Sequence, residues 1–135
     1  MRKIITTATM LAIFSPALAD DVTDVDRLLC SASEVTVCFE SSDCVDVMPW
    51  ELDMPQFIVI DLKKNVLSTT KASGENRSTP VRTLLRDNEE IVLQGVEAGR
   101  AFSFVIDEAT GLLTVAVASD GMSVSVYGAC TDADI

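Results

Sequence analysis

The sequence predicts an all-β domain, an antiparallel meander of about eight strands that forms an up-and-down barrel or a flattened sandwich. Two patterns predict this fold: apolar and polar residues alternate over short segments, and turn residues separate these segments at regular spacing. In addition, 48% of the residues are hydrophobic, which is enough for the core of one domain. The expected strands lie within residues 34–40, 44–48, 56–64, 65–71, 80–87, 89–96, 101–107, 112–118 and 122–130.

The links between these segments are short, so strands that are neighbours in sequence are expected to pair in space. Asp120-Gly121 is the strongest of the turn signals, because this dipeptide is favoured in two-residue hairpin loops. The polar residues 71–80 form the longest predicted loop. One short helix is expected at the N-terminus, where Val25, Leu28 and Leu29 have helical spacing and Thr23 is placed to cap the first turn.

The first 19 residues have the features of a secretory signal peptide. Two basic residues precede an apolar stretch that ends in Ala17-Leu18-Ala19, a small-x-small cleavage site. Cleavage there would leave residues 20–135 as a single domain that begins at Asp20. The apolar stretch is too short for a membrane anchor, and no second apolar span follows. We therefore expect a periplasmic or secreted protein with no membrane span after cleavage.

The four cysteines are predicted to form two disulfides, as in other small exported domains. Four cysteines allow three pairings. Cys38 and Cys44 face each other across the predicted turn at 41–43, which favours a Cys38–Cys44 link. Cys30 and Cys130 would then join the two ends of the domain. The spacing does not match a zinc site, and the chain contains no histidine.

The charge is strongly acidic, with a net value of −11 that would become −13 once Arg2 and Lys3 leave with the signal peptide. Such a surface repels nucleic acid and anionic lipid, and it would attract a basic partner, here a basic periplasmic protein. The plainer interpretation is that the acidic residues keep an exported protein soluble.

The stretches LLCSASEVTVC, MPQFIVIDLKK, VLQGVEAGRAFSFVIDEATGLLTV and SVSVYGACT resemble a family of small exported bacterial proteins of unknown function. The resemblance covers nearly all of the chain after residue 19. It implies secretion, small size and paired cysteines. It implies no activity, and no functional residue can be transferred from it.

The residues give little sign of catalysis. Without histidine, Ser-His and Cys-His nucleophile systems are excluded. Asp61, Asp107 and Glu108 are candidates for acid–base chemistry, but the favoured interpretation is that they serve in turns or on exposed strand faces. No phosphate-binding glycine loop and no metal-ligand spacing is present, so no cofactor or metal is expected. An enzyme is therefore the function class that we favour least.

The segment MPWELDMP places Met48, Trp50, Leu52 and Met54 in an irregular stretch between strands. These side chains either plug the mouth of the barrel or form a contact patch for a ligand or partner. Two function classes remain. The first is a binding module for a protein partner, such as an inhibitor domain. The alternative is a lipocalin-like carrier of a small apolar ligand, which is disfavoured because bulky inward side chains are expected to fill the interior.

Overall fold

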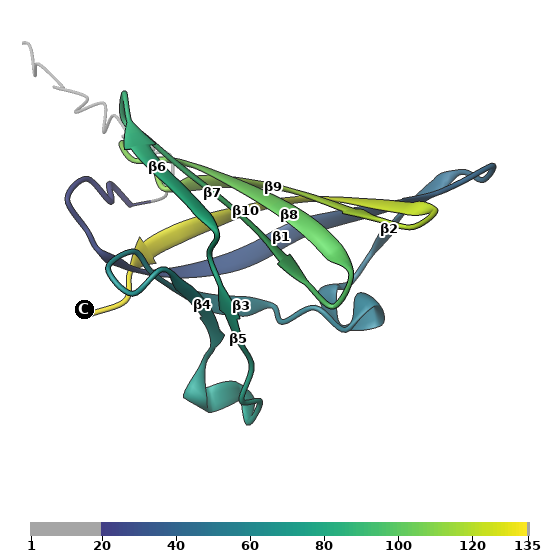
Figure 1. Cartoon of the computed structure of the whole chain (residues 1–135), viewed down its shortest axis with the longest axis horizontal. Coiled ribbons are helices and arrows are strands. Elements are labelled where there is room, and N and C mark those ends of the chain that lie inside the picture. The colour runs from purple at the N-terminus through teal and green to yellow at the C-terminus, as the bar shows by residue number, and fades with distance from the viewer. Residues whose placement is uncertain (1–19, 135) are drawn as a thin grey trace, which may run out of the picture.

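The structure is a computed structural model that describes residues 20–134, and the predicted signal peptide at 1–19 lies outside the described residues. The fold is an antiparallel half-barrel with almost no helix (Figure 1). Two short 3-10 helices, η1 (Pro49–Leu52) and η2 (Lys71–Ser73), interrupt it. The ten strands are β1 (Arg27–Phe39), β2 (Cys44–Val47), β3 (Phe57–Asp61), β4 (Val66–Thr69), β5 (Ser78–Pro80), β6 (Thr83–Asp87), β7 (Glu90–Glu97), β8 (Arg100–Asp107), β9 (Leu112–Ser119) and β10 (Met122–Asp132).

The sheet has the order β5-β4-β3-β1-β10-β9-β8-β7-β6, and β2 pairs with β1 outside this path. The all-β antiparallel prediction is confirmed. Sequence neighbours pair from β3 to β5 and from β6 to β10, as expected for a meander. The structure has ten strands where about eight were expected, partly because β5 lies within the predicted loop at 71–80.

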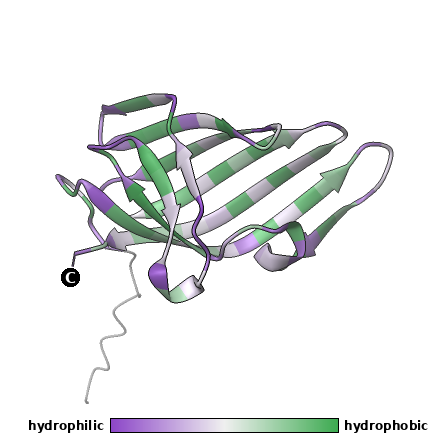
Figure 2. Ribbon diagram, turned by 60° about the horizontal axis from the view of Figure 1, so that its bottom comes forward, coloured by the Kyte–Doolittle hydropathy of each residue, from purple (hydrophilic) through white to green (hydrophobic). Residues whose placement is uncertain are grey.

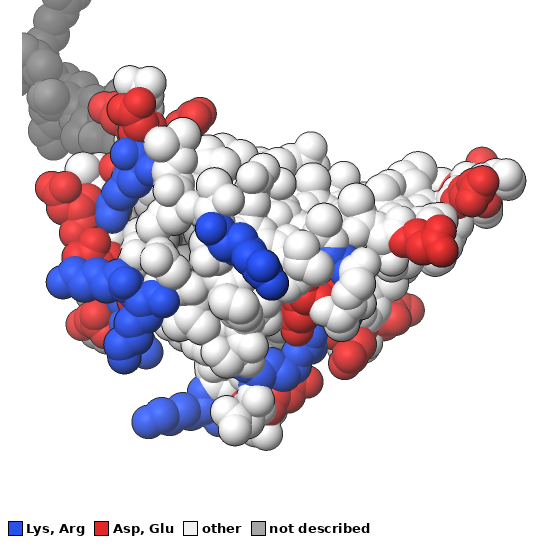
Figure 3. All heavy atoms as spheres, in the orientation of Figure 1, with Lys and Arg blue, Asp and Glu red and all other residues white. Residues whose placement is uncertain are grey.

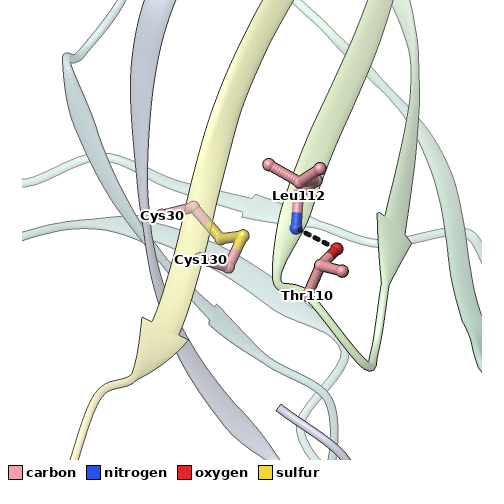
Figure 4. Close-up of a disulfide and its surroundings, with 4 residues drawn as sticks. All are labelled: Cys30, Thr110, Leu112 and Cys130. Carbon is pink, nitrogen blue, oxygen red and sulfur yellow. Dashed lines mark hydrogen bonds between the residues drawn. A yellow bond between two sulfur atoms is a disulfide. The ribbon is translucent and has the colours of Figure 1, made fainter. Parts of the chain in front are cut away.

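The first and last strands form the centre of the sheet. The dark blue ribbon of β1 and the yellow ribbon of β10 run side by side in Figure 1. Their register extends from Leu28 opposite Asp132 to Phe39 opposite Met122. The Cys30–Cys130 disulfide joins two residues that face each other in this register, next to the β8–β9 turn, where the Leu112 amide donates to the Thr110 hydroxyl (Figure 4).

The second disulfide, Cys38–Cys44, joins facing residues of the β1–β2 hairpin. These two links are the ones predicted from the hairpin and from the two ends of the domain. No described cysteine is free.

A bulge divides β1 into two halves. The register with β10 shifts between Ala32 and Glu34. Before the shift β1 pairs with β3, and after it β1 pairs with β2. Gly128 makes the bulge possible, since a Cβ at this position would lie 2.0 Å from the carbonyl oxygen of Ser31. Because of this bend, the first half of β1 belongs to the barrel wall and the second half belongs to the projecting β1–β2 hairpin.

The predicted N-terminal helix is wrong. Residues 23–24 form a turn, and the chain is in β1 from Arg27 onward. Leu28 and Cys30 alternate inward with 0% and 1% exposure, so strand periodicity prevails over the helical spacing of the same apolar residues. Pairing with β10 is a tertiary interaction, and such interactions override local propensity. Ahead of this strand, Val22 is fully buried, and its amide donates to the carbonyl of Glu108.

The core lies on the concave side of the sheet. Apolar and polar residues alternate along most strands, as the colour bands of Figure 2 show. The inward residues of β7 to β10 are buried, including Ile91, Leu93, Ile106 and Val124. β5 and β6 are the two end strands of the sheet. The short link between them is attached to β7 by a hydrogen bond, in which the Arg82 amide donates to the carbonyl of Gln94. Within residues 20–134, no helix is long and apolar enough to cross a membrane.

The two disulfides differ in the length of chain that they close, and this difference predicts their effects on stability. Replacing Cys30 and Cys130 together by Ala should lower the free energy of unfolding by about 5 kcal/mol, because this link closes a separation of 100 residues. Replacing Cys38 and Cys44, which are 6 residues apart, should cost only about 2 kcal/mol. Urea unfolding of both variants measures the difference. Equal losses would contradict the view that the long link limits the unfolded chain.

Candidate functional site

A cavity of about 130 Å³ lies inside the curve of the sheet and is partly open to solvent. One wall comes from β1, β3 and β4, and the opposite wall comes from β8, β9 and β10. Residues 54–56, which lead into β3, contribute to the lining between the walls. The apolar lining consists of Cys30, Ala32, Met54, Pro55, Ile58, Leu67, Phe102, Phe104, Leu113, Val115, Val117 and Val126. We refer to this space as the barrel cavity.

Bulky inward side chains form a continuous buried core, and the barrel cavity is a space that they leave open beside it. Phe102 and Phe104 line its β8 wall, with their ring centroids 5.5 Å apart in an edge-to-face arrangement. Gly95, which faces Phe102 in the register, leaves room for the phenyl ring, since a Cβ there would lie 2.5 Å from the Cζ atom of Phe102. The ring of Phe102 therefore lies close to the backbone of β7 at this point of the cavity wall.

The charged residues in the lining of the barrel cavity are two arginines and one glutamate, all partly exposed, and we refer to this part of the lining as its opening. Arg77 lies just before β5, Glu97 ends β7 and Arg100 begins β8. The Arg77 guanidinium donates to Glu97 Oε1 at 3.0 Å and to the carbonyl of Asp53 at 2.8 Å. The hydrogen bond to Glu97 raises the pKa of Arg77 above its usual value. This ion pair therefore connects the segment before β5 to the end of β7, and Glu97 neutralises the charge of Arg77.

Arg100 has a weaker set of partners. The β7–β8 turn, Ala98-Gly99, has positive φ at both residues and places Glu97 opposite Arg100. Arg100 Nη1 donates to the carbonyl of Leu52 at 3.5 Å, the outer limit of a hydrogen bond. No carboxylate among residues 20–134 forms an ion pair with it. Most donors of this guanidinium are therefore free for a ligand or for water.

The predicted patch Met48, Trp50, Leu52 and Met54 is divided by the structure. Met48 and Trp50 are 54% and 64% exposed, so the indole does not fill the mouth of the barrel. Leu52 and Met54 are partly buried and pack against the core. Met54 also lines the barrel cavity. Thus one half of the patch is an outer surface, and the other half belongs to the cavity.

The candidate acid–base residues all have structural partners. Asp61 Oδ1 accepts hydrogen bonds from the backbone amides of Lys63 and Lys64. Asp107 Oδ1 likewise accepts hydrogen bonds from two backbone amides of the turn that follows it. Glu108 is 7% exposed and accepts from Arg86 Nε at 2.5 Å. The bonds of Asp61 and Asp107 fit the turn roles that the sequence favoured, whereas Glu108 is buried against Arg86 and is not an exposed acid. No group of His, Cys, Asp or Glu that could hold a metal ion is found within residues 20–134.

Charged and uncharged side chains are unevenly distributed over the surface. In Figure 3 a broad uncharged area covers the upper middle of the view, whereas acidic side chains gather at the left end and at the right-hand tip. Separately, Val96, Val105, Leu112 and Tyr127 are exposed at outward positions of β7 to β10. A second hollow, near Asp20 and Phe57, has a larger volume of about 280 Å³, but it is more open to solvent than the barrel cavity. It would therefore bury less of a ligand.

Sequence reasoning missed the residues at the cavity opening. Arg77 lies in what reads as a polar loop, and nothing local indicates that it contacts Glu97 from 20 residues away. Gly95 lies inside β7, within a segment that the sequence predicts as a strand. A glycine inside a strand often marks a place where another group approaches closely, and this signal could have indicated the space taken by Phe102.

Comparison with known proteins adds no family or activity, because no family model, no curated protein and no solved structure matches the chain. The resemblance to small exported bacterial proteins stays a prediction.

The exposure of Trp50 leads to a stability prediction. Trp50→Ala should change the free energy of unfolding by less than about 1 kcal/mol, as is usual for surface substitutions. Leu28→Ala, at a fully buried position, should cost about 2–5 kcal/mol and serves as the contrast. Thermal and urea unfolding measure both changes. A loss of about 3 kcal/mol or more for Trp50→Ala would show that the indole plugs the barrel after all.

Proposed function

We propose that the protein is a binding module that takes up a small molecule, or the apolar end of a larger one, in the barrel cavity. The observation that carries this proposal is the cavity itself: an apolar interior that opens past three charged side chains, Arg77, Glu97 and Arg100. Small-molecule sites commonly combine an apolar concave wall with a few placed polar groups. The alternative from the sequence, a lipocalin-like carrier, is thus the function that the geometry supports best.

The size of the cavity limits the ligand. Its volume of about 130 Å³ is below that of most drug-sized pockets, which are roughly 300–1,000 Å³. An apolar cavity of about 150 Å³ holds one benzene molecule. The barrel cavity therefore suits a single aromatic ring or a chain of about four to six carbons. A longer ligand would extend through the opening into solvent.

Binding to a protein partner is the second candidate, and a separate observation favours it. Met48 and Trp50 are both exposed and lie two residues apart in sequence, and both residue types are enriched at interfaces. The two candidates respond differently to Trp50→Ala. This change should abolish partner binding if the indole anchors a partner, and it should leave uptake into the barrel cavity unaffected.

The proposed location is outside the cytoplasm. Two disulfides fit an oxidising compartment. Signal cleavage after Ala19 would release the domain there, and a periplasmic or secreted carrier would meet its ligand in that compartment. N-terminal sequencing of the exported protein tests the cleavage site.

The cavity can be tested with a matched pair of substitutions. Val117→Phe fills the space from the β9 wall, because Val117 lines the cavity. This variant should weaken binding of a short alcohol such as 1-hexanol at least tenfold, measured by calorimetry or protein NMR. Val105→Phe makes the same chemical change on the outer face, where Val105 is 39% exposed, and should leave binding unchanged.

Overpacking lowers stability by about 1–3 kcal/mol, so both variants need a check of folding by circular dichroism. Val117→Ala provides a second test, since it enlarges the cavity and should preserve binding. The proposal fails if 1-hexanol does not bind the wild-type protein, or if Val105→Phe weakens binding as much as Val117→Phe does.

A further inference from the structure

We infer that Arg100 selects ligands with a single negative charge, and that the ligand class is a short amphipathic monocarboxylate with its tail in the barrel cavity. This inference rests on the proposed function, since it assigns a head group to the ligand of the same cavity. It starts from a difference between the two arginines at the opening, one of which is engaged by a carboxylate and one of which is not.

Arg77 has little capacity left for a ligand. Its Nη2 donates to Glu97, and its Nη1 donates to the Asp53 carbonyl. The side chains of Asp53 and Glu75 add further negative charge around it, which contributes to its raised pKa. An anion approaching Arg77 would compete with groups that already neutralise this charge.

Arg100 has the opposite character. The one hydrogen bond of its side chain is the 3.5 Å bond to the carbonyl of Leu52, and no described carboxylate forms an ion pair with it. It lines the cavity together with Phe102, two residues further along the same strand, so one ligand can reach both the guanidinium and the apolar wall. The planar guanidinium fork matches the two oxygens of a carboxylate. An unpaired cationic side chain therefore lines the apolar space, next to its aromatic wall.

The acidic surroundings limit the charge of the ligand. Glu97 lines the same opening, and Asp53 and Glu75 flank Arg77. The whole chain carries a net charge of −11. One direct contact with Arg100 can offset the cost of removing a single negative charge from water. For a dianion such as a phosphate monoester, attraction to Arg100 and repulsion by the acidic side chains both rise in proportion to the charge, whereas the desolvation cost rises with its square. A cationic head is also disfavoured, because Glu97 is already held by Arg77.

The test compares head groups on one tail. Hexanoate, 1-hexanol, hexyl phosphate and hexylamine are titrated at pH 7 into the oxidised protein by calorimetry. Wild-type protein should bind hexanoate about tenfold or more tightly than 1-hexanol, since a hydrogen bond to a charged group contributes at least this much. Hexyl phosphate and hexylamine should bind more weakly than hexanoate.

Substitutions then assign the preference to one residue. Arg100→Gln should remove the preference for hexanoate and leave the affinity for 1-hexanol unchanged. Arg100→Lys keeps the charge without the planar fork and should retain part of the preference. The control is Arg82→Gln, at an exposed arginine that does not line the cavity, and it should behave as wild type.

The outcomes separate this inference from the function on which it rests. Equal binding of hexanoate and 1-hexanol by wild-type protein would overturn the role of Arg100 while leaving the cavity as a ligand site. The same conclusion would follow if Arg100→Gln kept the preference, or if hexylamine or hexyl phosphate bound most tightly. Failure of all four compounds to bind would overturn the proposed function itself.

Discussion

The pairing of the first strand with the last is the constraint on which the rest of the structure depends. β1 and β10 are far apart in sequence, yet they form the centre of the sheet, and Cys30 and Cys130 join them covalently. The meander on one side, from β6 to β10, and the shorter one on the other, from β3 to β5, are connected through this pair. Because the disulfide shortens the free loop of the unfolded chain, it offsets much of the entropy lost in bringing the two strands together.

The barrel cavity is a consequence of the same pairing. Its two walls come from opposite sides of the β1–β10 pair, so neither meander alone encloses it. Gly128 and Gly95 both lie inside strands and shape the cavity walls. At either position a Cβ atom would collide with a neighbouring group, so only glycine allows the observed close approach. The first allows β1 to bend against β10, and the second allows Phe102 to lie close to β7. The apolar space thus follows from backbone and ring placement as much as from the size of the lining residues.

Much of the fold could be predicted from sequence because its signals are local. Strand alternation and turn residues reveal where strands begin and end, and the positions of Cys38 and Cys44 in one hairpin indicate their link. The N-terminal strand was misassigned because Val25, Leu28 and Leu29 fit a helical period. Only the distant partner β10 determines that Leu28 and Leu29 lie in a strand. The charged opening could not be predicted for the same reason: Arg77, Glu97 and Arg100 meet through contacts between distant segments.

The central claim is that the concave side of the half-barrel is a ligand site. Methyl NMR tests it most directly, because valine and leucine methyl groups lie on both faces of the same strands. Addition of a short apolar-tailed ligand should shift the methyl signals of Leu113, Val115, Val117 and Val126, which line the cavity, and leave those of Val96 and Val105 on the outer face unchanged. Shifts confined to the outer face, with no change at the cavity residues, would contradict the account.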